Sequence, residues 1–430
     1  MPTGAELLTE LEHRGLVQDS TDRAALERRL DGGRTGLYCG FDPTADSLHI
    51  GNLQSIMLLR RFQLAGHAPI ALVGGATGMI GDPSGRSDER HFLDGDVLDE
   101  NRRSIEAQLR GLLDFDDGPA AARLVDNRAW TESVSVLDFF RDVGKFVTIN
   151  TMLAKDSVKS RLQRESGISF TEFSYMLLQA NDFFVLHRDQ QCDLQVAGSD
   201  QWGNITAGID LVRRRTGDQV HGLTAPLIVR ADGTKFGKSE GENLWLSAER
   251  TSPYRLYQYM LNVPDDEVGP LLLRLTTVPV ADCHQIAADH AATPQRRDGQ
   301  RRLAREITSL LHGSAVIAQI ESAAALLFGE PIDDADQEAF ELLSTELPTT
   351  RIPLSELLGI DPVDLLLRVD GLAKSKGEIR KNPGGYYVNQ RSLAARAEED
   401  RPSIVESDLR HATFILLQRG KNAHHLVVAD

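Results

Sequence analysis

The segment GLYCGFDPTADSLHIGN, residues 36–52, carries the pattern that decides the fold. Its first seven residues form a short apolar run that ends in an acid, and Pro43 restricts the backbone after it. Apolar positions at helical spacing come after Ile50. A second run of this kind, PIALVGGA at 69–76, also precedes a helical pattern, which begins after Asp94. This alternation predicts a parallel α/β sheet with ligands at the carboxyl ends of its strands.

The hydrophobic pattern also divides the rest of the chain. Residues 100–190 are mainly helical by their apolar spacing, CDLQVAGSDQW returns to a strand followed by glycine, and 251–325 is helical again. The segment 329–363 is acidic and punctuated by prolines. We therefore expect a Rossmann-like domain at 1–228 with a helical insertion around 100–165, a mainly helical second domain at 229–328, a linker at 329–360 and a small C-terminal module at 361–430.

Composition places the chain among soluble globular proteins. Hydrophobic residues make up 41% and charged residues 26%. No run of 18 apolar residues is present, so no membrane span is predicted, and the N-terminal segment lacks a signal-peptide pattern. Cys39, Cys192 and Cys283 are isolated, which excludes a CxxC metal site and gives no disulfide framework. We therefore expect a reducing, cytoplasmic location.

The charge is distributed unevenly along the chain. The net charge is −16, which by itself argues against a nucleic-acid partner. Residues 361–430, however, hold 11 Lys and Arg against 10 Asp and Glu. Among them is a basic cluster composed of Arg368, Lys374, Lys376, Arg380 and Lys381. Such a cluster suits contacts to phosphate groups, although a solvated helix face would have the same composition.

The stretch FDPTADSLHIGN, residues 41–52, has the features of a phosphate site. Thr44 can cap the segment after Pro43, and His49 and Gly51 stand at the start of the predicted helix. A helix N-terminus offers free backbone N–H groups and a positive dipole end. Gly51 leaves room for a purine or a ribose, and His49 can donate to a phosphate oxygen. A His-x-Gly sequence alone is more often structural, so the full stretch carries the prediction.

A second phosphate-binding element is ADGTKFGKSEGENLWL, which comes directly after residue 230. Lys235 and Lys238 lie three apart in this Gly-rich segment and are followed by a serine. Only three residues separate Gly233 from Gly237, whereas a P-loop has four between its glycines. Two lysines on such a loop suggest positive charges that close over a phosphate as negative charge develops. An exposed basic loop is the alternative.

A polar helix face is predicted within TEFSYMLLQANDFF. Tyr175, Gln179 and Asp182 are spaced i, i+4 and i+7, so they share one face of an otherwise apolar helix. Because buried polar groups must be paired, such a face indicates either a ligand or a purely structural network.

Two further segments supply polar groups near the ends of predicted strands. LQVAGSDQWGN places Gln195, Gly198, Asp200 and Gln201 beyond a strand, where a sugar or carboxylate would sit. GGATGMIGDPSG is glycine-rich, but its spacing does not match the GxGxxG dinucleotide fingerprint. Its charged candidate is Asp82, which is suited to an ammonium group.

Together these elements resemble the bacterial-type tyrosyl-tRNA synthetases, which are class I aminoacyl-tRNA synthetases. FDPTADSLHIGN resembles the HIGH signature, KFGKS resembles KMSKS, and GSDQWGN with the Tyr-Gln-Asp helix matches the tyrosine-binding region. The segment LLLRVDGLAKSKGEIRKNPGGYYVNQ is similar to an RNA-binding module of the ribosomal S-four type. Asn52 replaces the second histidine of HIGH, while Phe236 and Gly237 replace the Met-Ser of KMSKS.

The resemblance implies a role for each candidate residue. Stabilisation of the leaving pyrophosphate is implied for Thr44, His49, Lys235, Lys238 and Ser239. Tyrosine binding is implied for Tyr38, Asp82, Tyr175, Gln179, Asp182, Gln195 and Gln201. ATP binding is implied for Cys39, Gly40, Asp42, Gly51, Asn52, Gly198, Asp200 and Lys238. Contacts to tRNA are implied for Arg368, Lys374, Lys376, Arg380 and Lys381.

The resemblance implies the activity of a tyrosine--tRNA ligase acting on L-tyrosine, ATP and tRNA(Tyr). No tightly bound cofactor or protein metal site is expected, and magnesium would accompany ATP. A homodimer is expected, with its interface near 130–165. A tryptophanyl-tRNA synthetase is the nearest alternative, but the Tyr38 and Asp182 pair favours a phenol. A catalytically idle RNA-binding paralogue is the other alternative, and the retained lysines and His49 argue against it.

Overall fold

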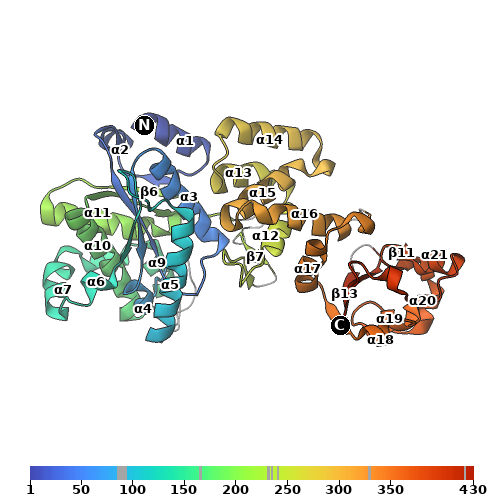
Figure 1. The fold of residues 1–430 in the computed structure, drawn as a ribbon. Coiled ribbons are helices and arrows are strands. Elements are labelled where there is room, and N and C mark those ends of the chain that lie inside the picture. The colour runs from blue at the N-terminus through green and yellow to red at the C-terminus, as the bar shows by residue number, and fades with distance from the viewer. Residues whose placement is uncertain are drawn as a thin grey trace. The chain divides into compact units, whose positions relative to one another are not determined.

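The computed structural model describes residues 1–84, 94–163, 167–229, 233, 236–239, 242–327, 331–420 and 423–430. These residues form two compact units (Figure 1). The first unit consists of Met1–Ser252 and Tyr259–Ile307, and the second of Pro253–Gln258 and Thr308–Asp430. None of the helices in the described ranges is both long enough and apolar enough to cross a membrane.

A six-stranded sheet with the order β1-β6-β5-β2-β3-β4 forms the centre of the first unit. Its strands are β1 (Asp19–Ser20), β2 (Gly36–Phe41), β3 (Ala68–Val73), β4 (Arg123–Asp126), β5 (Cys192–Gly198) and β6 (His221–Ala225). All neighbours are parallel except β1, which pairs antiparallel with β6 at the edge. The predicted α/β class with a Rossmann-like parallel sheet is therefore confirmed.

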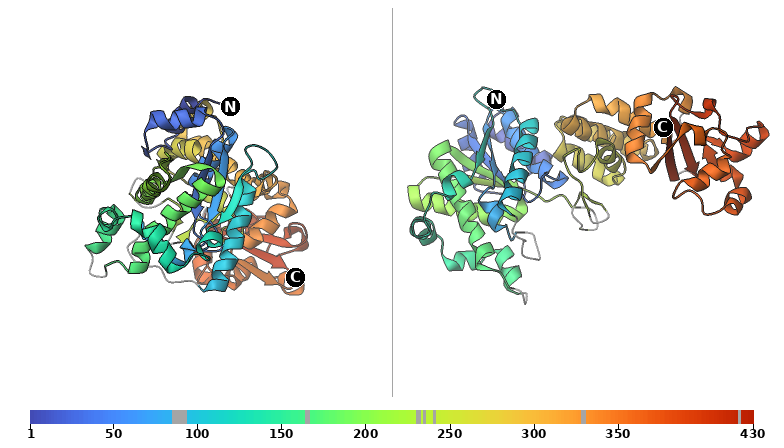
Figure 2. Two further views of the ribbon diagram at one scale, coloured as in Figure 1. Left: turned by 90° about the vertical axis from the view of Figure 1, so that its left-hand side faces the viewer. Right: turned by 60° about the horizontal axis from the view of Figure 1, so that its bottom comes forward.

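Helices cover both faces of this sheet. Those before β6 are α1 (Gly4–His13), α2 (Arg23–Asp31), α3 (Ile50–Leu64), α4 (Thr77–Ile80), α5 (Gly95–Leu112), α6 (Arg128–Thr131), α7 (Val136–Asp142), α8 (Ile149–Leu153), α9 (Asp156–Leu162), α10 (Phe170–Gln190) and α11 (Trp202–Thr216). The chain leaves β2 toward β3 and β4 but adds β5 and β6 on the other side of β2. Since such crossovers are right-handed, α3 and α5 lie on one face and α10 and α11 on the other (Figures 1 and 2).

The polar helix predicted from TEFSYMLLQANDFF is α10, and local sequence sets both of its ends. At its start the Ser169 hydroxyl accepts a hydrogen bond from the Glu172 amide. At its end Gln191 takes the left-handed conformation, with φ 54°. Phe183 on this helix is fully buried and packs against Tyr38 of β2 and against α11 at Gly208. The helix therefore fixes its polar face relative to the central strands.

Two strands of the sheet do not follow from the sequence pattern. β4 is four residues long and lies inside the stretch interpreted as mainly helical, 100–190. All four of its residues are only partly buried, so it lacks the apolar run by which β2 and β3 are recognised. β6, with the sequence HGLTA, is fully buried but contains one leucine as its only large apolar residue. Both strands depend on pairing with a neighbour more than on their own composition.

The remaining helices extend over the region that the apolar spacing predicts as helical. They are α12 (Pro253–Leu261), α13 (Val268–Leu275), α14 (Val280–Ala292), α15 (Asp298–His312) and α16 (Ala315–Leu327). The compact units divide this region, because Tyr259–Ile307 belongs to the first and Thr308 onward to the second. The boundary between the two compact units therefore lies inside the stretch 229–328, which the sequence pattern predicts as a single second domain.

The C-terminal sheet begins earlier than residue 361. Its order is β11-β10-β12-β13-β9. Its strands are β9 (Thr349–Ile352), β10 (Tyr386–Val388), β11 (Arg391–Ser392), β12 (Phe414–Arg419) and β13 (Ala423–Ala429), and its helices include α18 (Leu354–Leu357), α19 (Pro362–Arg368), α20 (Lys376–Lys381) and α21 (Leu393–Glu398). The segment expected to be a linker, 329–360, contains helix α17 (Gln337–Glu346) and β9, which pairs in parallel with β13. A module that starts at 361 would leave β13 without this neighbour.

Candidate active site

A cavity of about 850 Å³ opens at the carboxyl ends of β2 and β5. The strand order reverses between these two strands, which is where ligands bind in open α/β sheets. All predicted tyrosine-binding residues line the cavity: Tyr38, Asp82, Tyr175, Gln179, Asp182, Gln195 and Gln201. Predicted nucleotide-end residues that line it are Cys39, Gly40, Asp42, Thr44, His49, Gly51, Asn52, Gly198 and Asp200. The structure therefore brings together residues from four separate sequence segments.

At one end of the cavity lie two buried polar groups, the Tyr38 hydroxyl and the Asp182 carboxyl group. Tyr38 is 1% exposed, and its hydroxyl has no hydrogen-bond partner within the described residues. Asp182 is 3% exposed and accepts hydrogen bonds from Asn127 Nδ2 at 3.0 Å and from Trp130 Nε1 at 2.9 Å. Burial raises the pKa of Asp182 to about 7, while both donors act in the opposite direction. Burial also raises the pKa of Tyr38, and the nearby Asp182 adds to this effect.

A chain of side-chain hydrogen bonds connects Asp182 with Asp42. Asn127 is fully buried and donates to both Asp182 and Thr77, each at 3.0 Å. The Thr77 hydroxyl in turn donates to Asp42 Oδ1 at 2.7 Å, and the Tyr175 hydroxyl donates to Asp42 Oδ2 at 2.8 Å. A structural network was one of the two explanations offered for the polar helix face, and such a network is present. It lies in the wall of the cavity.

The glycine-rich segment after β3 makes this network possible. A Cβ atom at Gly74 would lie 2.1 Å from Asp42 Oδ1 and 2.3 Å from Thr77 Oγ1. No side chain larger than hydrogen fits there without displacing both groups. The glycines of GGATG therefore allow the backbone to approach a carboxylate of the site, a different role from a dinucleotide fingerprint.

A second chain of hydrogen bonds holds the group expected to bind an ammonium. Asp82 is 8% exposed and accepts from Gln201 Nε2 at 2.6 Å and from the Ser84 amide at 2.9 Å. Asn204 donates to Gln201 Oε1 at 3.0 Å and to Gln179 Oε1 at 3.1 Å. Asp82, Gln201 and Gln179 are therefore fixed relative to one another by Asn204, a residue that the motifs did not single out.

In contrast to the glutamines of this network, the glutamine at the centre of the sheet has a side-chain oxygen without a partner among the described residues. Gln195 on β5 is 2% exposed, and its Oε1 has no hydrogen-bond partner within the described residues. A buried acceptor that lines a cavity is suited to a donor from a bound molecule. Cys39 on β2 is also buried, and burial raises the pKa of its thiol to about 12. It therefore faces the cavity as a neutral thiol.

At the other end of the cavity lies the start of α3, where His49 and Asn52 form the helix cap. His49 is the N-cap residue, and its amide donates to Asn52 Oδ1 at 3.0 Å. Asn52 therefore caps the helix, whereas Thr44 lies in a preceding turn closed by its own amide and the Asp42 carbonyl. Thr44 therefore does not cap α3, whose N-cap residue is His49. A Cβ atom at Gly51 would come within 3.0 Å of the His49 ring, so this glycine accommodates the histidine.

Backbone pairing joins the two signature segments. Ile50 donates to Leu244 O at 2.8 Å, and Leu246 donates to Leu48 O at 2.8 Å. An isolated bridge also pairs His49 with Trp245. The residues that come after KFGKS therefore run beside the HIGN segment at the mouth of the cavity.

The departure from KMSKS has a packing explanation. Phe236 is buried and lies edge-on to the Tyr259 ring, with 5.5 Å between centroids. Gly237 has φ 83°, and a Cβ atom there would lie 2.0 Å from Ile50 Cγ2. Its amide donates to the Tyr259 hydroxyl at 3.0 Å. Only glycine fits this position against α3.

The two lysines of KFGKS, Lys235 and Lys238, fall partly outside the described residues. Lys235 lies outside the described residues, as do the side chains of Lys238 and Ser239. The backbone of Lys238–Ser239 forms β7, which pairs antiparallel with β8 (Glu242–Asn243). Their implied contacts to pyrophosphate therefore stay predictions.

With the geometry established, comparison with known proteins identifies the family. A family model described as tRNA synthetases class I (W and Y) matches residues 30–329, and W and Y denote tryptophan and tyrosine. The chain belongs to this family. The match covers both signature segments and every residue that lines the cavity.

Individual relatives support the membership along nearly the whole chain. A protein of Opitutus terrae named Tyrosine--tRNA ligase is 47% identical, with 98% of this chain and 99% of that protein covered. A Bacillus subtilis protein named Tyrosine--tRNA ligase 1 is 44% identical, with the same two shares covered. The crystal structure of a C-terminally truncated Aspergillus nidulans mitochondrial tyrosyl-tRNA synthetase is 32% identical with a TM-score of 0.68, covering 75% of this chain and 94% of that one.

Outside the synthetase site, the predicted basic cluster is exposed around α19 and α20. Arg368 ends α19, while Lys376, Arg380 and Lys381 lie on α20 and Lys374 just precedes it. Two members form ion pairs within the module, Arg368 with Glu356 and Lys376 with Asp364. Exposed pairs of this kind contribute at most about 1 kcal/mol, so they leave the surface available to a stronger anion.

Four residues of the site were missed by sequence reasoning. Asn127, Trp130, Thr77 and Asn204 form hydrogen bonds with the predicted residues or with one another, but none was singled out, although Thr77 lies in GGATGMIGDPSG and Asn204 ends GSDQWGN. Asn127 and Trp130 belong to the turn and short helix after β4, which was itself not predicted. No local signal reveals Asn127 and Trp130, since their role depends on Asp182, which is far away in sequence.

Proposed function

We propose that this chain is a tyrosine--tRNA ligase, which activates L-tyrosine with ATP and transfers it to tRNA(Tyr). The observation that carries the proposal is the pair of Tyr38 and Asp182. The Tyr38 hydroxyl is buried and unpartnered within the described residues, and Asp182 is buried and fixed by two donors. Between them a phenolic hydroxyl both accepts and donates a hydrogen bond, which an indole N–H cannot do.

The cavity orients the rest of tyrosine by charge. Asp82 and the Tyr175 hydroxyl lie in the wall with Gln179, where they accept from the ammonium group. Because Asp82 is already held by Gln201 and Ser84, its carboxylate needs little reorganisation when the ammonium arrives. This arrangement leaves the tyrosine carboxylate free to face the nucleotide end.

The reaction then needs positioning and charge stabilisation. A carboxylate oxygen of tyrosine attacks the α-phosphorus of ATP, the bond to the β-phosphate oxygen breaks, and pyrophosphate leaves. His49, Thr44, Lys235, Lys238 and Ser239 stabilise the departing charge, and magnesium accompanies ATP as part of the substrate. A hydroxyl of the terminal tRNA ribose next attacks the tyrosyl carbonyl carbon, and AMP leaves.

ATP–pyrophosphate exchange tests the amino-acid specificity. We expect exchange that depends on tyrosine and is absent with tryptophan. Tryptophan-dependent exchange would assign the chain to the other branch of its family. No exchange with either amino acid, in protein that is folded and binds tRNA, would indicate the idle paralogue.

The C-terminal sheet is proposed to bind tRNA through the basic cluster on α19 and α20. Deletion after Glu346 removes the whole sheet, including β9, whereas deletion after residue 360 leaves that strand behind. We expect the shorter chain to keep exchange and to lose tRNA charging. Phosphate contacts should also make charging, but not exchange, fall steeply with added salt. Normal charging by the shortened chain would contradict this assignment.

We further propose a homodimer and a cytoplasmic location. Large apolar side chains are exposed within one stretch of the first unit: Val134, Val136, Leu137, Phe140, Ile149, Leu153, Leu162 and Phe170. Leu137 is 79% exposed, and a patch of such residues is typical of an interface. Sedimentation should show a dimer that Leu137→Asp weakens. A monomeric wild-type protein would contradict the proposal.

A further inference from the structure

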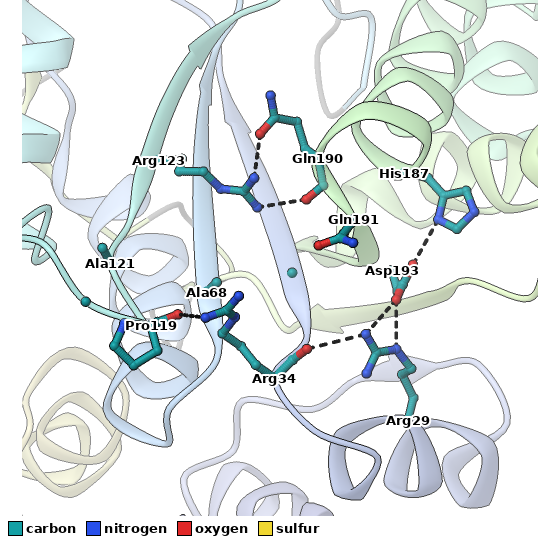
Figure 3. A pocket seen from close by; sticks show the side chains of 12 residues that line it. Arg29, Arg34, Ala68, Pro119, Ala121, Arg123, His187, Gln190, Gln191 and Asp193 are labelled. Atoms are coloured by element: carbon teal, nitrogen blue, oxygen red, sulfur yellow. Dashed lines mark hydrogen bonds and ion pairs between the residues drawn. The ribbon is translucent and has the colours of Figure 1, made fainter.

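A second cavity, of about 580 Å³, lies at the opposite edge of the six-stranded sheet (Figure 3). Its lining includes the first residues of three strands, Gly36, Ala68 and Arg123, together with Asp193 at the start of β5. Because β2, β3, β4 and β5 are parallel, their amino ends share the edge that faces away from the candidate active site. Among the described residues, none lines both cavities.

The lining of this cavity is basic, although the chain as a whole is acidic. Arg29 of α2, Arg34 before β2 and Arg123 of β4 place three guanidinium groups around it (Figure 3). Asp193 is the only carboxylate among the described lining residues, and it pairs with Arg29 at 2.7 Å. His187 contacts the other oxygen of Asp193 at 2.9 Å. The Asp193 carboxylate is therefore already shared between Arg29 and His187.

The other two arginines contact neutral acceptors. Arg34 donates to the Pro119 carbonyl at 2.7 Å, and Arg123 donates to the carbonyl and the side-chain oxygen of Gln190. Neither forms an ion pair with any carboxylate in the described part of the chain. Burial lowers the pKa of Arg123, and the positive charge of Arg34 lowers it further. Within the described residues, two like charges thus stand close together without a counter-charge of their own.

The bonds to neutral acceptors leave N–H donors of both arginines unused within the described residues. Arginines often bind carbonyls at the ends of helices and loops, and Arg123 does so at the end of α10. A guanidinium has five N–H donors, however, and these bonds use one donor of Arg34 and two of Arg123. The remaining donors and both charges match an oxyanion, which the planar guanidinium binds in a two-pronged manner.

We propose that this cavity binds a small molecule through a phosphate group. Its volume falls within the range of small-molecule sites, about 300–1,000 Å³. A concave cavity lined by several guanidinium groups suits a terminal phosphate with two negative charges better than it suits an extended nucleic-acid backbone. Inorganic phosphate and a phosphate ester share this chemistry, and the experiment separates them.

The test measures binding of inorganic phosphate and of ribose 5-phosphate to the full-length protein by equilibrium dialysis. Arg34→Gln is the principal variant, because this side chain is exposed and holds no strand in place. Arg123→Gln is the second. Arg213→Gln is the matched control, since Arg213 is exposed on α11, pairs with Asp210 and lines neither cavity. Exchange activity with tyrosine is measured in parallel.

We expect Arg34→Gln to weaken phosphate binding at one site by about 10–100-fold, the effect of losing one charged hydrogen bond. The control should bind as wild type does, and all three variants should keep their exchange activity. Tighter binding of ribose 5-phosphate than of phosphate would identify an ester as the ligand. Equal binding by wild type and Arg34→Gln, or no binding by wild type, would overturn the proposal. So would a loss of tRNA binding in Arg34→Gln without any phosphate binding.

Discussion

The two ends of the candidate active site are built differently. The end that contains Tyr38 and Asp182, which we propose binds the tyrosine hydroxyl, is called the hydroxyl end. There Asp182 is buried, and the side chains of Asn127 and Trp130 fix it by hydrogen bonds. The end at the start of α3, which we propose binds the phosphates of ATP, is called the phosphate end. There backbone pairing and glycine do most of the positioning, as in the bonds between Leu48–Ile50 and the residues after KFGKS. The difference matches the tasks, because selecting one hydroxyl requires fixed groups in a low dielectric, whereas stabilising a leaving group requires charge where it develops.

The largest effects should come from the phosphate end. Lys235→Ala and Lys238→Ala should each slow tyrosyl-adenylate formation by about 10²–10³, the usual result of removing one donor to developing charge. Tyrosine binding should change little, because this charge appears only in the transition state. Pre-steady-state rates and equilibrium tyrosine binding measure the two effects separately. Rates within a few-fold of wild type in both variants would show that the lysines do not act on the pyrophosphate.

Changes at the hydroxyl end should alter selectivity instead. Asp182→Ala removes the acceptor for the tyrosine hydroxyl and takes away the acceptor that Asn127 and Trp130 share. Losing a hydrogen bond to a charged group costs about 1.5–3 kcal/mol, so the preference for tyrosine over phenylalanine should fall about 10–100-fold. The ratio of exchange efficiencies for the two amino acids measures it. An unchanged ratio would mean that α10 does not contact the hydroxyl.

Sequence reasoning succeeded where one segment contains the whole signal. The spacing of Tyr175, Gln179 and Asp182 places them on one helix face, and α10 carries all three into the cavity. It failed where the signal lies in contacts between segments. Asn127 and Trp130 come after a strand too short and too exposed to be recognised, and the exclusion of a side chain at Gly237 depends on Ile50, far away in sequence.

A smaller and more specific effect is expected from Trp130. Asp182 has its pKa raised to about 7 by burial, so it is protonated below that pH and charged above it. Because the charged carboxylate is the stronger acceptor, tyrosine affinity should rise about 5-fold as pH increases through 7. Trp130→Phe removes a donor that stabilises the carboxylate, so the midpoint should move to higher pH. A KM profile for tyrosine between pH 6 and 9 measures the midpoint, and an unmoved midpoint would argue against this role.

An effect of similar size is expected from Tyr38→Phe, and it should have opposite signs for stability and selectivity. The Tyr38 hydroxyl is 1% exposed and has no partner within the described residues, so without substrate it is a desolvated group with no hydrogen bond. Removing such a group relieves its desolvation penalty, and the free energy of unfolding of the unliganded protein should rise by about 1 kcal/mol. The ring packing against Phe183 is kept, since only one oxygen is lost.

With tyrosine bound, the same hydroxyl gains its partner. Its removal should lower the tyrosine-to-phenylalanine preference by about 0.5–1.5 kcal/mol, less than the loss of Asp182, because the lost donor is uncharged. Chemical denaturation and exchange ratios on one preparation measure both quantities. If Tyr38→Phe destabilised the unliganded protein, its hydroxyl would already have a hydrogen-bond partner there. The hydroxyl end would then be a structural network that is complete without substrate. If stability rises while selectivity falls, the unpaired hydroxyl is a contact kept for the substrate.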